Sequence, residues 1–405
     1  MDEQLDDEAV GRLSDYFDRI GLILGHRKRR ASFAMYAMGV LGEGARKSVE
    51  PIAARACGDP DESDATHQRL LHFLTDSSWE DRAVRREAVH EALGAMAARE
   101  PIVAWIFDDT GFLKQGTHSV GVQRQYTGSA GKITNCQVGV SLSITTATLH
   151  LPIDFELYLP KSWLDDPRRR AEARIPQDVV FKTKPELALD MLRRAVADDW
   201  PRGVVLGDAA YGDVVDFRSE VLVLGFDYIF GVSSTAKVWR CGHDLCTYGP
   251  KRSLAELAAG ADFRRVTWRD GTKKRMTARF AFERVVPSYN DPAVELKHRK
   301  DLWLIMEWRD DETERIRFHF SSLPRDMTKK RLVRLLKERY RTEQVYRELK
   351  SELGLDHYEG RRFPGWHHHV SVTLACYAFV VAERARAFPP SAGWTRLLAT
   401  DTYAA

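Results

Sequence analysis

The chain has 405 residues and a formal net charge of +3, from 61 Lys and Arg against 58 Asp and Glu. This length predicts two or three domains, and a hydrophobic content of 44% provides for ordinary globular cores. Five scattered Cys argue against a disulfide framework and for a reducing compartment. The amino terminus lacks a signal-peptide pattern, and the longest apolar run, 370–382, is shorter than the roughly 20 residues that span a bilayer. We therefore expect a soluble cytoplasmic protein that makes no membrane contact.

The first hundred residues have the periodicity of helices. Apolar residues recur at helical spacing from Leu13 to Leu24, and the basic cluster His26–Arg30 follows. Glycines at 42 and 44 separate two further helices, and this pattern fits a DNA-reading unit or any small helical bundle. The predicted helices after the first are 31–41, 47–56, 65–74 and 79–98.

After Pro101 the pattern changes to strands alternating with helices, which is typical of an α/β core. The apolar run 102–107 ends in Asp108-Asp109-Thr110, and a second run, 204–207, ends in Asp208. The other predicted elements of this part are strands 120–126, 134–145 and 228–232, a turn at 128–131, and helices 186–197 and 214–224.

Residues 234–300 return to a β pattern. Two strands, 263–269 and 273–286, flank Asp270-Gly271, which is a strong hairpin signal. We interpret this stretch as an insertion into the core. The elements predicted after it are strands 302–308 and 316–321, a basic helix within 325–352, and a buried helix over 370–387.

The basic helix carries ten Lys or Arg and four Asp or Glu between Arg325 and Lys350. At helical spacing, Arg339, Glu343, Tyr346 and Lys350 share one face. Two interpretations stay open from this stretch alone. The face is a solvated surface with salt bridges, or its carboxylate binds a metal ion while its cations hold phosphates.

Three acids stand out as candidate metal ligands. Asp109 (or Asp108) and Asp208 follow apolar strands, where sites form in open α/β sheets, and Glu343 lies on the basic helix. Carboxylates from separate elements suit Mg²⁺ or Mn²⁺, although Asp after a strand is also a common turn former or helix cap. Glu348 and Glu352 are rival third acids, but on a helix they point away from the face of Glu343.

The sequence resembles the DDE transposases of bacterial insertion sequences. Arg339, Glu343 and Lys350 fit the spacing of that family's Tyr-Arg-Glu-Lys signature, with Leu336 in place of the Tyr. Asp108-Asp109-Thr110 resembles the first-aspartate motif, in which the acid directly before Thr is catalytic, and this favours Asp109. The segment 207–212 resembles the second-aspartate motif, and further similar phrases extend the resemblance from about residue 30 to 385.

The resemblance implies an RNase H-like α/β core with a β-rich insertion and an all-helical amino-terminal domain. It implies that Asp109, Asp208 and Glu343 bind two Mg²⁺ ions, with Mn²⁺ as a substitute, and that the protein cuts and joins DNA. Arg339 and Lys350 match positions that hold DNA near the cut, and Arg341, Tyr346 and Arg347 are further candidates for DNA contact on the same helix. The expected domains are a DNA-binding domain 1–98, core segments 99–233 and 301–388, the insertion 234–300, and a tail 389–405.

The expected partners are double-stranded DNA, as transposon terminal inverted repeats and as target, and a second copy of the chain in a homodimer on DNA. The expected location is the bacterial cytoplasm, in association with the nucleoid. Two alternatives remain: a domesticated DNA-binding regulator, and a metal-dependent nuclease that does not transfer strands.

Overall fold

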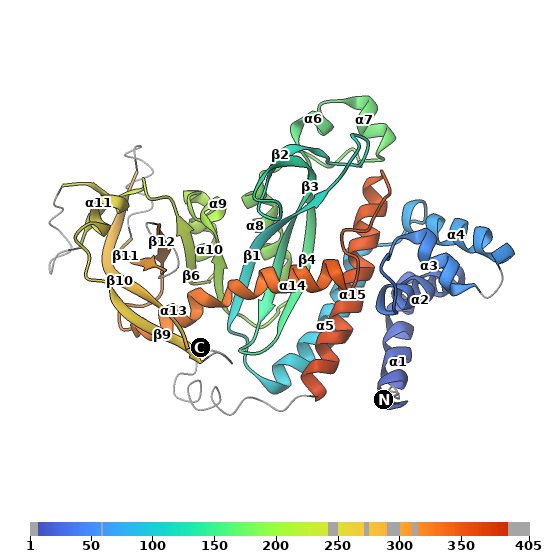
Figure 1. The fold of residues 1–405 in the computed structure, drawn as a ribbon, viewed down its shortest axis with the longest axis horizontal. Coiled ribbons are helices and arrows are strands. Elements are labelled where there is room, and N and C mark those ends of the chain that lie inside the picture. Colours follow the sequence, from blue (N-terminus) through green and yellow to red (C-terminus); the bar gives the residue numbers. More distant parts are fainter. Residues whose placement is uncertain are drawn as a thin grey trace. The chain divides into compact units, whose positions relative to one another are not determined.

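The computed structural model describes residues 7–57, 60–241, 250–270, 275–289, 300–309 and 315–387. These residues divide into two compact units (Figure 1). Unit 1 comprises Met1–Ile102, Asp109–Thr183 and Arg341–Ala405, and unit 2 comprises Val103–Asp108 and Lys184–Tyr340. Strand β1 (Ala104–Leu113) contributes to both. Gly271 of the predicted hairpin turn and the predicted tail 389–405 lie outside the described residues.

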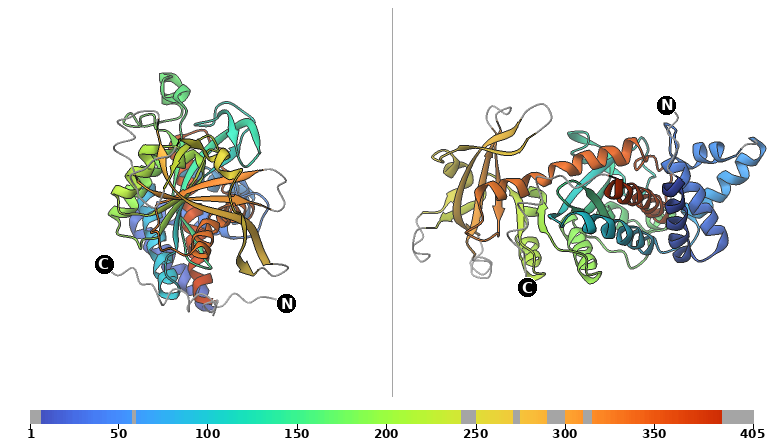
Figure 2. Two further views of the ribbon diagram at one scale, coloured as in Figure 1. Left: turned by 90° about the vertical axis from the view of Figure 1, so that its left-hand side faces the viewer. Right: turned by 90° about the horizontal axis from the view of Figure 1, so that it is seen from below.

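Unit 1 contains the five helices predicted for the amino-terminal region, and all five are confirmed. The long helix α15 begins at Phe363, seven residues before the predicted start, and it is buried along most of its length. It runs beside α5 (Figures 1 and 2). The helices of this unit are α1 (Asp7–Leu24), α2 (Arg27–Leu41), α3 (Val49–Ala56), α4 (Pro60–Thr75), α5 (Asp81–Arg99), α6 (Lys161–Leu164), α7 (Pro167–Glu172), α14 (Tyr340–Ser351) and α15 (Phe363–Ala387).

The strands of unit 1 are arranged around β3 (Lys132–Thr145), which pairs antiparallel with β2 (Gln123–Thr127) and with β4 (His150–Tyr158). The sequence predicted β3 but not β4, because Pro152 cannot donate to a ladder and argues against a strand. In the structure the β3–β4 register shifts between Leu142 and Ser143, and Ser143 is paired with Pro152. This irregularity accommodates the proline.

Unit 2 is built on a sheet in the order β1-β5-β6-β12-β11-β10-β7-β8, with β9 paired to β10. Strands β1, β5 and β6 are parallel, and the later pairs are antiparallel. The strands are β5 (Val204–Gly207), β6 (Tyr228–Val232), β7 (Lys237–Arg240), β8 (Arg252–Ser253), β9 (Arg264–Asp270), β10 (Arg275–Ser288), β11 (Leu302–Trp308) and β12 (Ile316–Ser321). The helices are α8 (Lys184–Ala197), α9 (Ala209–Gly212), α10 (Val215–Val223), α11 (Leu254–Ala258) and α13 (Lys329–Glu338).

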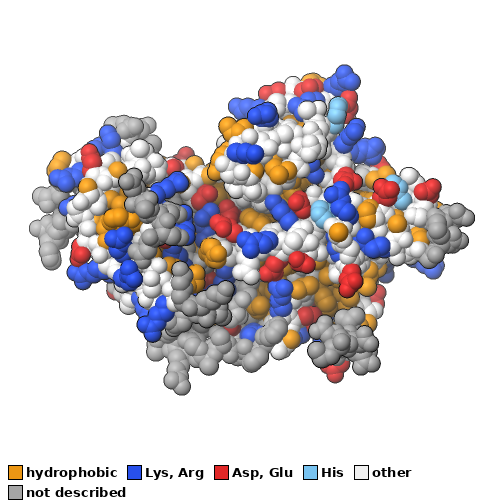
Figure 3. Space-filling view, in the orientation of Figure 1, with side chains coloured by type: hydrophobic (Ala, Val, Ile, Leu, Met, Phe, Trp, Pro, Cys, Tyr) orange, Lys and Arg blue, Asp and Glu red, His pale blue; other side chains and the backbone are white. Residues whose placement is uncertain are grey.

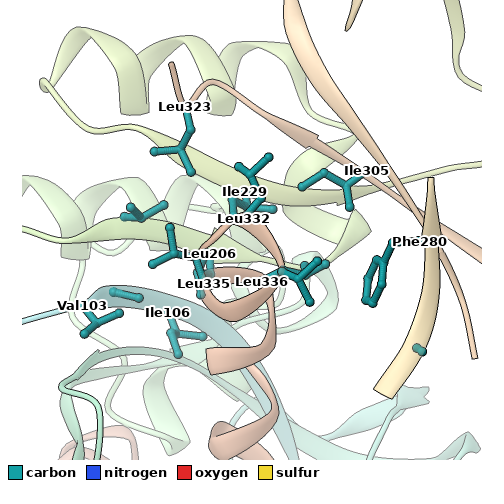
Figure 4. Packing of buried hydrophobic residues seen from close by; sticks show 14 residues of the cluster. Val103, Ile106, Leu206, Ile229, Phe280, Ile305, Leu323, Leu332, Leu335 and Leu336 are labelled. Atoms are coloured by element: carbon teal, nitrogen blue, oxygen red, sulfur yellow. The ribbon is translucent and has the colours of Figure 1, made fainter. Parts of the chain in front are cut away.

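The core of unit 2 forms where α13 covers one face of this sheet. Leu332, Leu335 and Leu336 of α13 pack against Ile106, Leu206 and Ile229 of the three parallel strands, as Figure 4 shows. Leu336, which stands at the Tyr position of the signature, is 8% exposed. That position therefore serves packing in this chain rather than contact with a phosphate.

The sequence predicted one continuous basic helix, but in the structure this helix divides at Arg339. Arg339 keeps helical backbone angles and follows the last residue of α13, and α14 begins at Tyr340. No Gly or Pro marks this division, so the local sequence could not reveal it. Among the described residues, no helix combines the length and the apolar character that crossing a membrane requires.

Candidate functional site

Strand β1 carries the first acidic motif, and its side chains alternate between the two faces of the sheet. Ala104 and Ile106 belong to the core beneath α13, so Asp108 continues that face. Asp108 is 9% exposed, and its Oδ1 lies 3.4 Å from Nη2 of Arg339. Asp109 follows as a half-buried residue that alternation directs to the opposite face. Within unit 2, the structure thus places Asp108 beside the signature arginine.

Asp208 follows β5, the strand next to β1. One carboxylate oxygen, Oδ1, accepts a hydrogen bond of 2.9 Å from the backbone N–H of Ala210 and caps the short helix α9. The other, Oδ2, lies 3.5 Å from Nη2 of Arg339. Because β1 and β5 are parallel with Ile106 opposite Leu206, Asp108 within β1 and Asp208 after β5 lie at the same level, two residues past this pair.

Two carboxylates of unit 2 therefore converge on one positive charge. The guanidinium of Arg339 contacts both Asp108 and Asp208 through the same nitrogen. Arg339 is about a third exposed and ends α13, so the packing of that helix sets its position. The arrangement brings two hard-oxygen donors close together around one cation.

In the second-aspartate motif, residues 207–212, the position of α9 depends on a close approach of its backbone to that of β6. A methyl group added at Gly212 would collide with the carbonyl oxygen of Gly231 and would lie 2.8 Å from Cβ of Phe230. One added at Gly231 would lie 2.9 Å from the backbone nitrogen of Ala209. Only glycine at both positions lets α9 rest on β6, and this packing fixes the turn that carries Asp208.

Helix α14, described within unit 1, buries one face and exposes another. Thr342, Val345, Tyr346 and Leu349 are buried, and Glu343 and Arg347 are exposed. Glu343, Arg347 and Lys350 are spaced at i, i+4 and i+7, so these three share a face. The sequence had grouped Tyr346 with Glu343, whereas the structure directs Tyr346 into the core.

Tyr346 and Arg341 are both engaged inside unit 1. The hydroxyl of Tyr346 hydrogen-bonds Oγ of Ser141 on β3, and the ring packs edge-on against Phe155. Arg341 donates to the carbonyl oxygens of Thr146, at 3.4 Å, and of Ala147 in the turn after β3. Both side chains therefore attach α14 to the strands of its own unit.

Lys350 connects α14 to the second half of β1. Its Nζ donates to Oγ1 of Thr110, at 2.8 Å, and to the carbonyl oxygen of Gly111, at 2.7 Å. Burial lowers the pKa of Lys350 below its ordinary value, while Asp356 opposes that effect. The ammonium group of Lys350 is thus hydrogen-bonded to the two residues that follow Asp109.

The rival acids have other roles in the structure. Glu348 accepts hydrogen bonds from the hydroxyl of Tyr377, at 3.0 Å, and from Arg384, at 2.9 Å. Both partners lie on α15, so Glu348 holds two helices of unit 1 together. Glu352 accepts a hydrogen bond of 2.8 Å from the hydroxyl of Ser351.

The three predicted metal ligands come from both units: Asp109 and Glu343 from unit 1, and Asp208 from unit 2. Within the part of the chain that the structure describes, no three His, Cys, Asp or Glu side chains form a group that could hold a metal ion. The pair of carboxylates that the structure does bring together is Asp108 with Asp208, through Arg339.

His319 is a neighbour of this edge that the sequence did not single out. It lies opposite Gly231 across the β6–β12 pair, and both of its buried ring nitrogens lack a hydrogen-bond partner. Burial, followed by the charges of Lys337, Arg339 and Arg317, lowers the pKa of His319 to about 3. The imidazole is therefore uncharged near neutral pH. Only strand register reveals this placement, because nothing in the local sequence distinguishes His319.

Comparison with known proteins identifies the family of the chain. The family model of a DDE superfamily endonuclease matches residues 17–275, which is more than half of the chain, and that of a transposase DDE domain matches residues 181–379. The chain is also 28% identical over 204 residues to a probable transposase for insertion sequence element IS701 from Microchaete diplosiphon. That match covers 50% of this chain and 49% of the relative, so the chain spans about half the length of this relative. The chain belongs to the DDE superfamily of endonucleases and transposases.

Proposed function

We propose that this protein is a cut-and-paste DNA transposase. It would cleave phosphodiesters at the ends of a mobile element and join the freed 3′ ends to target DNA. Membership of the DDE superfamily supports this function. The single observation that carries it is the convergence of Asp108 and Asp208, each two residues past the paired Ile106 and Leu206 of adjacent parallel strands, on the signature residue Arg339.

Divalent metal ions fit the donors that these motifs supply. Carboxylate oxygens are the ligands that Mg²⁺ and Mn²⁺ prefer, and a cationic group already lies against two of them in unit 2. We propose Asp109, Asp208 and Glu343 as the residues that hold the metal, with Asp108 as the alternative first acid. Bound ions would supply an activated water and stabilise the attacking and leaving oxygens.

The DNA contacts proposed for the basic helices follow from charge and exposure. Arg347 is exposed on the face of Glu343 and can meet a phosphate directly. Arg339 and Lys350 occupy the signature positions that hold DNA near the cut. Arg341 and Tyr346, which are engaged inside unit 1, would add to binding by fixing α14.

The partners and location of the protein are part of the same proposal. Two element ends must be brought together before joining, so we propose a homodimer on DNA, with terminal inverted repeats and target DNA as substrates. Residues 1–98 would bind the ends. Such a protein would work in the bacterial cytoplasm, at the nucleoid.

The test uses the purified chain, the DNA ends that flank its own gene, and a plasmid target, with Mg²⁺ or with EDTA. We expect Mg²⁺-dependent cutting at those ends and joining to the plasmid, and we expect both to disappear in Asp208→Asn. Binding without cutting in Mg²⁺ or Mn²⁺ would instead identify a DNA-binding regulator. Cutting without joining would identify a nuclease.

The first acid can be assigned by a matched pair of variants. Asp108→Asn and Asp109→Asn each remove one charge from neighbouring positions of the same strand. Whichever Asp holds the metal, its Asn variant should lose at least about a hundredfold in cleavage rate, equivalent to about 3 kcal/mol, while the other variant should lose less than about tenfold. Single-turnover cleavage in Mg²⁺ measures both. Equal, small losses would remove β1 from the metal site.

A further inference from the structure

A cavity of about 420 Å³ lies among the amino-terminal helices of unit 1, away from the acidic motifs in the sequence. The first turns of α2, the end of α4 and the segment before α5 enclose it. The lining residues are His26, Lys28, Arg29, Ser32, Arg69, His72, Phe73, Asp76, Ser77 and Ser78. This volume is within the roughly 300–1,000 Å³ of ordinary ligand sites, so the cavity admits a group of nucleotide size.

The charge of the lining is positive. Arg69 donates to the sulfur of Met35 at 3.2 Å, and Arg29 donates to the carbonyl oxygen of Ser78. Neither guanidinium, nor the ammonium of Lys28, pairs with a carboxylate of the described residues. Asp76 is the one acid of the lining, and its carboxylate is paired with Arg174, at 2.6 Å, and with Arg362.

The face of unit 1 seen in Figure 3 does not share this bias. Basic and acidic side chains are intermixed over the end of the molecule where Figure 1 places α3 and α4. On the face that Figure 3 shows, charge is therefore balanced, and the basic residues that bear on the cavity are those that line it. Three cationic side chains that pair with no carboxylate of the described residues line this one cavity. Its low-dielectric walls strengthen their attraction for an anion.

The start of α2 adds donors to these charges. The helix has 15 residues and begins at Arg27, and its dipole favours an anion at this end, where the N–H of Lys28 already donates to Nδ1 of His26 at 3.2 Å. Ser32, one turn further on, lines the cavity and is 3% exposed. Its hydroxyl adds an uncharged donor at the wall of the cavity.

We infer that this cavity binds a phosphate group of the DNA backbone, through Lys28, Arg69 and the hydroxyl of Ser32. That the anion belongs to DNA rests on the proposed function. A contact to a phosphate positions DNA without reading its sequence. It gives the amino-terminal helices a phosphate-binding site of their own, separate from the residues that cut.

The test is the salt dependence of duplex binding by the full-length chain. Lys28→Ala and Arg69→Ala should each weaken binding and reduce the slope of log affinity against log salt by about 0.9, the value for one phosphate contact. Ser32→Ala removes no charge and should weaken binding severalfold at an unchanged slope. Arg27→Ala is the matched control, because Arg27 is exposed in the same helical turn but does not line the cavity.

These outcomes separate the cavity from the proposed function. If the wild-type chain binds no duplex, the proposed function fails. If it binds, but the Lys28 and Arg69 variants match Arg27→Ala in affinity and slope, a diffuse surface charge is responsible and the cavity is not the site. If the Lys28 and Arg69 variants lose more affinity for the element ends than for an unrelated duplex, the contact reads sequence and is not a phosphate contact. Circular dichroism of each variant confirms that the helices are intact.

Discussion

Replacement of Glu343 by Gln is expected to abolish DNA cleavage while DNA affinity stays within about twofold of the wild type. An amide is a far weaker ligand for a hard divalent ion than a carboxylate, so the variant keeps the shape of the side chain but loses its charge. The cleavage rate should fall at least about a thousandfold, which corresponds to about 4 kcal/mol of transition-state free energy. Single-turnover cleavage of the element ends in Mg²⁺ measures this loss. Affinity for the same ends in EDTA measures binding.

Glu352→Gln provides the matched control for this result. Glu352 follows α14 directly and carries the same functional group, and its carboxylate accepts a hydrogen bond from its neighbour Ser351. We expect this variant to cleave at nearly the wild-type rate. If Glu343→Gln cleaves as fast as Glu352→Gln, Glu343 is not the third acid.

Replacement of Gly212 by Ala is expected to lower the free energy of unfolding of unit 2 by about 3 kcal/mol. The added methyl group would meet the backbone of Gly231 and Cβ of Phe230, and neither can move without separating α9 from β6. Asp208 begins α9, so the displacement would reach the acid as well. Cleavage should therefore fall together with stability. Urea unfolding and single-turnover cleavage measure the two effects.

Gly260→Ala is the corresponding control in the same unit. No atom lies within 4 Å of the position that its methyl group would take. Its free energy of unfolding should stay within about 0.5 kcal/mol of the wild type. If Gly212→Ala is equally harmless, the approach of α9 to β6 does not fix the second acid.

Several elements could be predicted from the sequence because local pattern alone defines them. Strands β6, β11 and β12 have the predicted bounds, since each is a short run of apolar or alternating residues bounded by polar segments. Predicted strand 120–126 begins later than expected, at Gln123, because the residues before it form a turn. Asp166 and Asp213 accept backbone hydrogen bonds, from Arg168 and Ser233 respectively.

The histidines at 367–369 are buried at the start of α15. His368 contacts the carbonyl oxygens of Leu74 and Trp79, and His369 contacts the hydroxyl of Tyr36 at 2.9 Å. Burial lowers the pKa of His369 to about 4, so the ring is uncharged at neutral pH.

The sequence by itself determined the family, the order of its three acidic motifs and most of the helices and strands, because these depend on residue type and local spacing. Only the tertiary structure decided that Asp108 lies beside Arg339 and that Tyr346 turns into the core. It also divided the basic helix at Arg339, between segments that pack in different units. Such choices depend on strand register and on contacts between residues more than 200 positions apart, which no local pattern encodes.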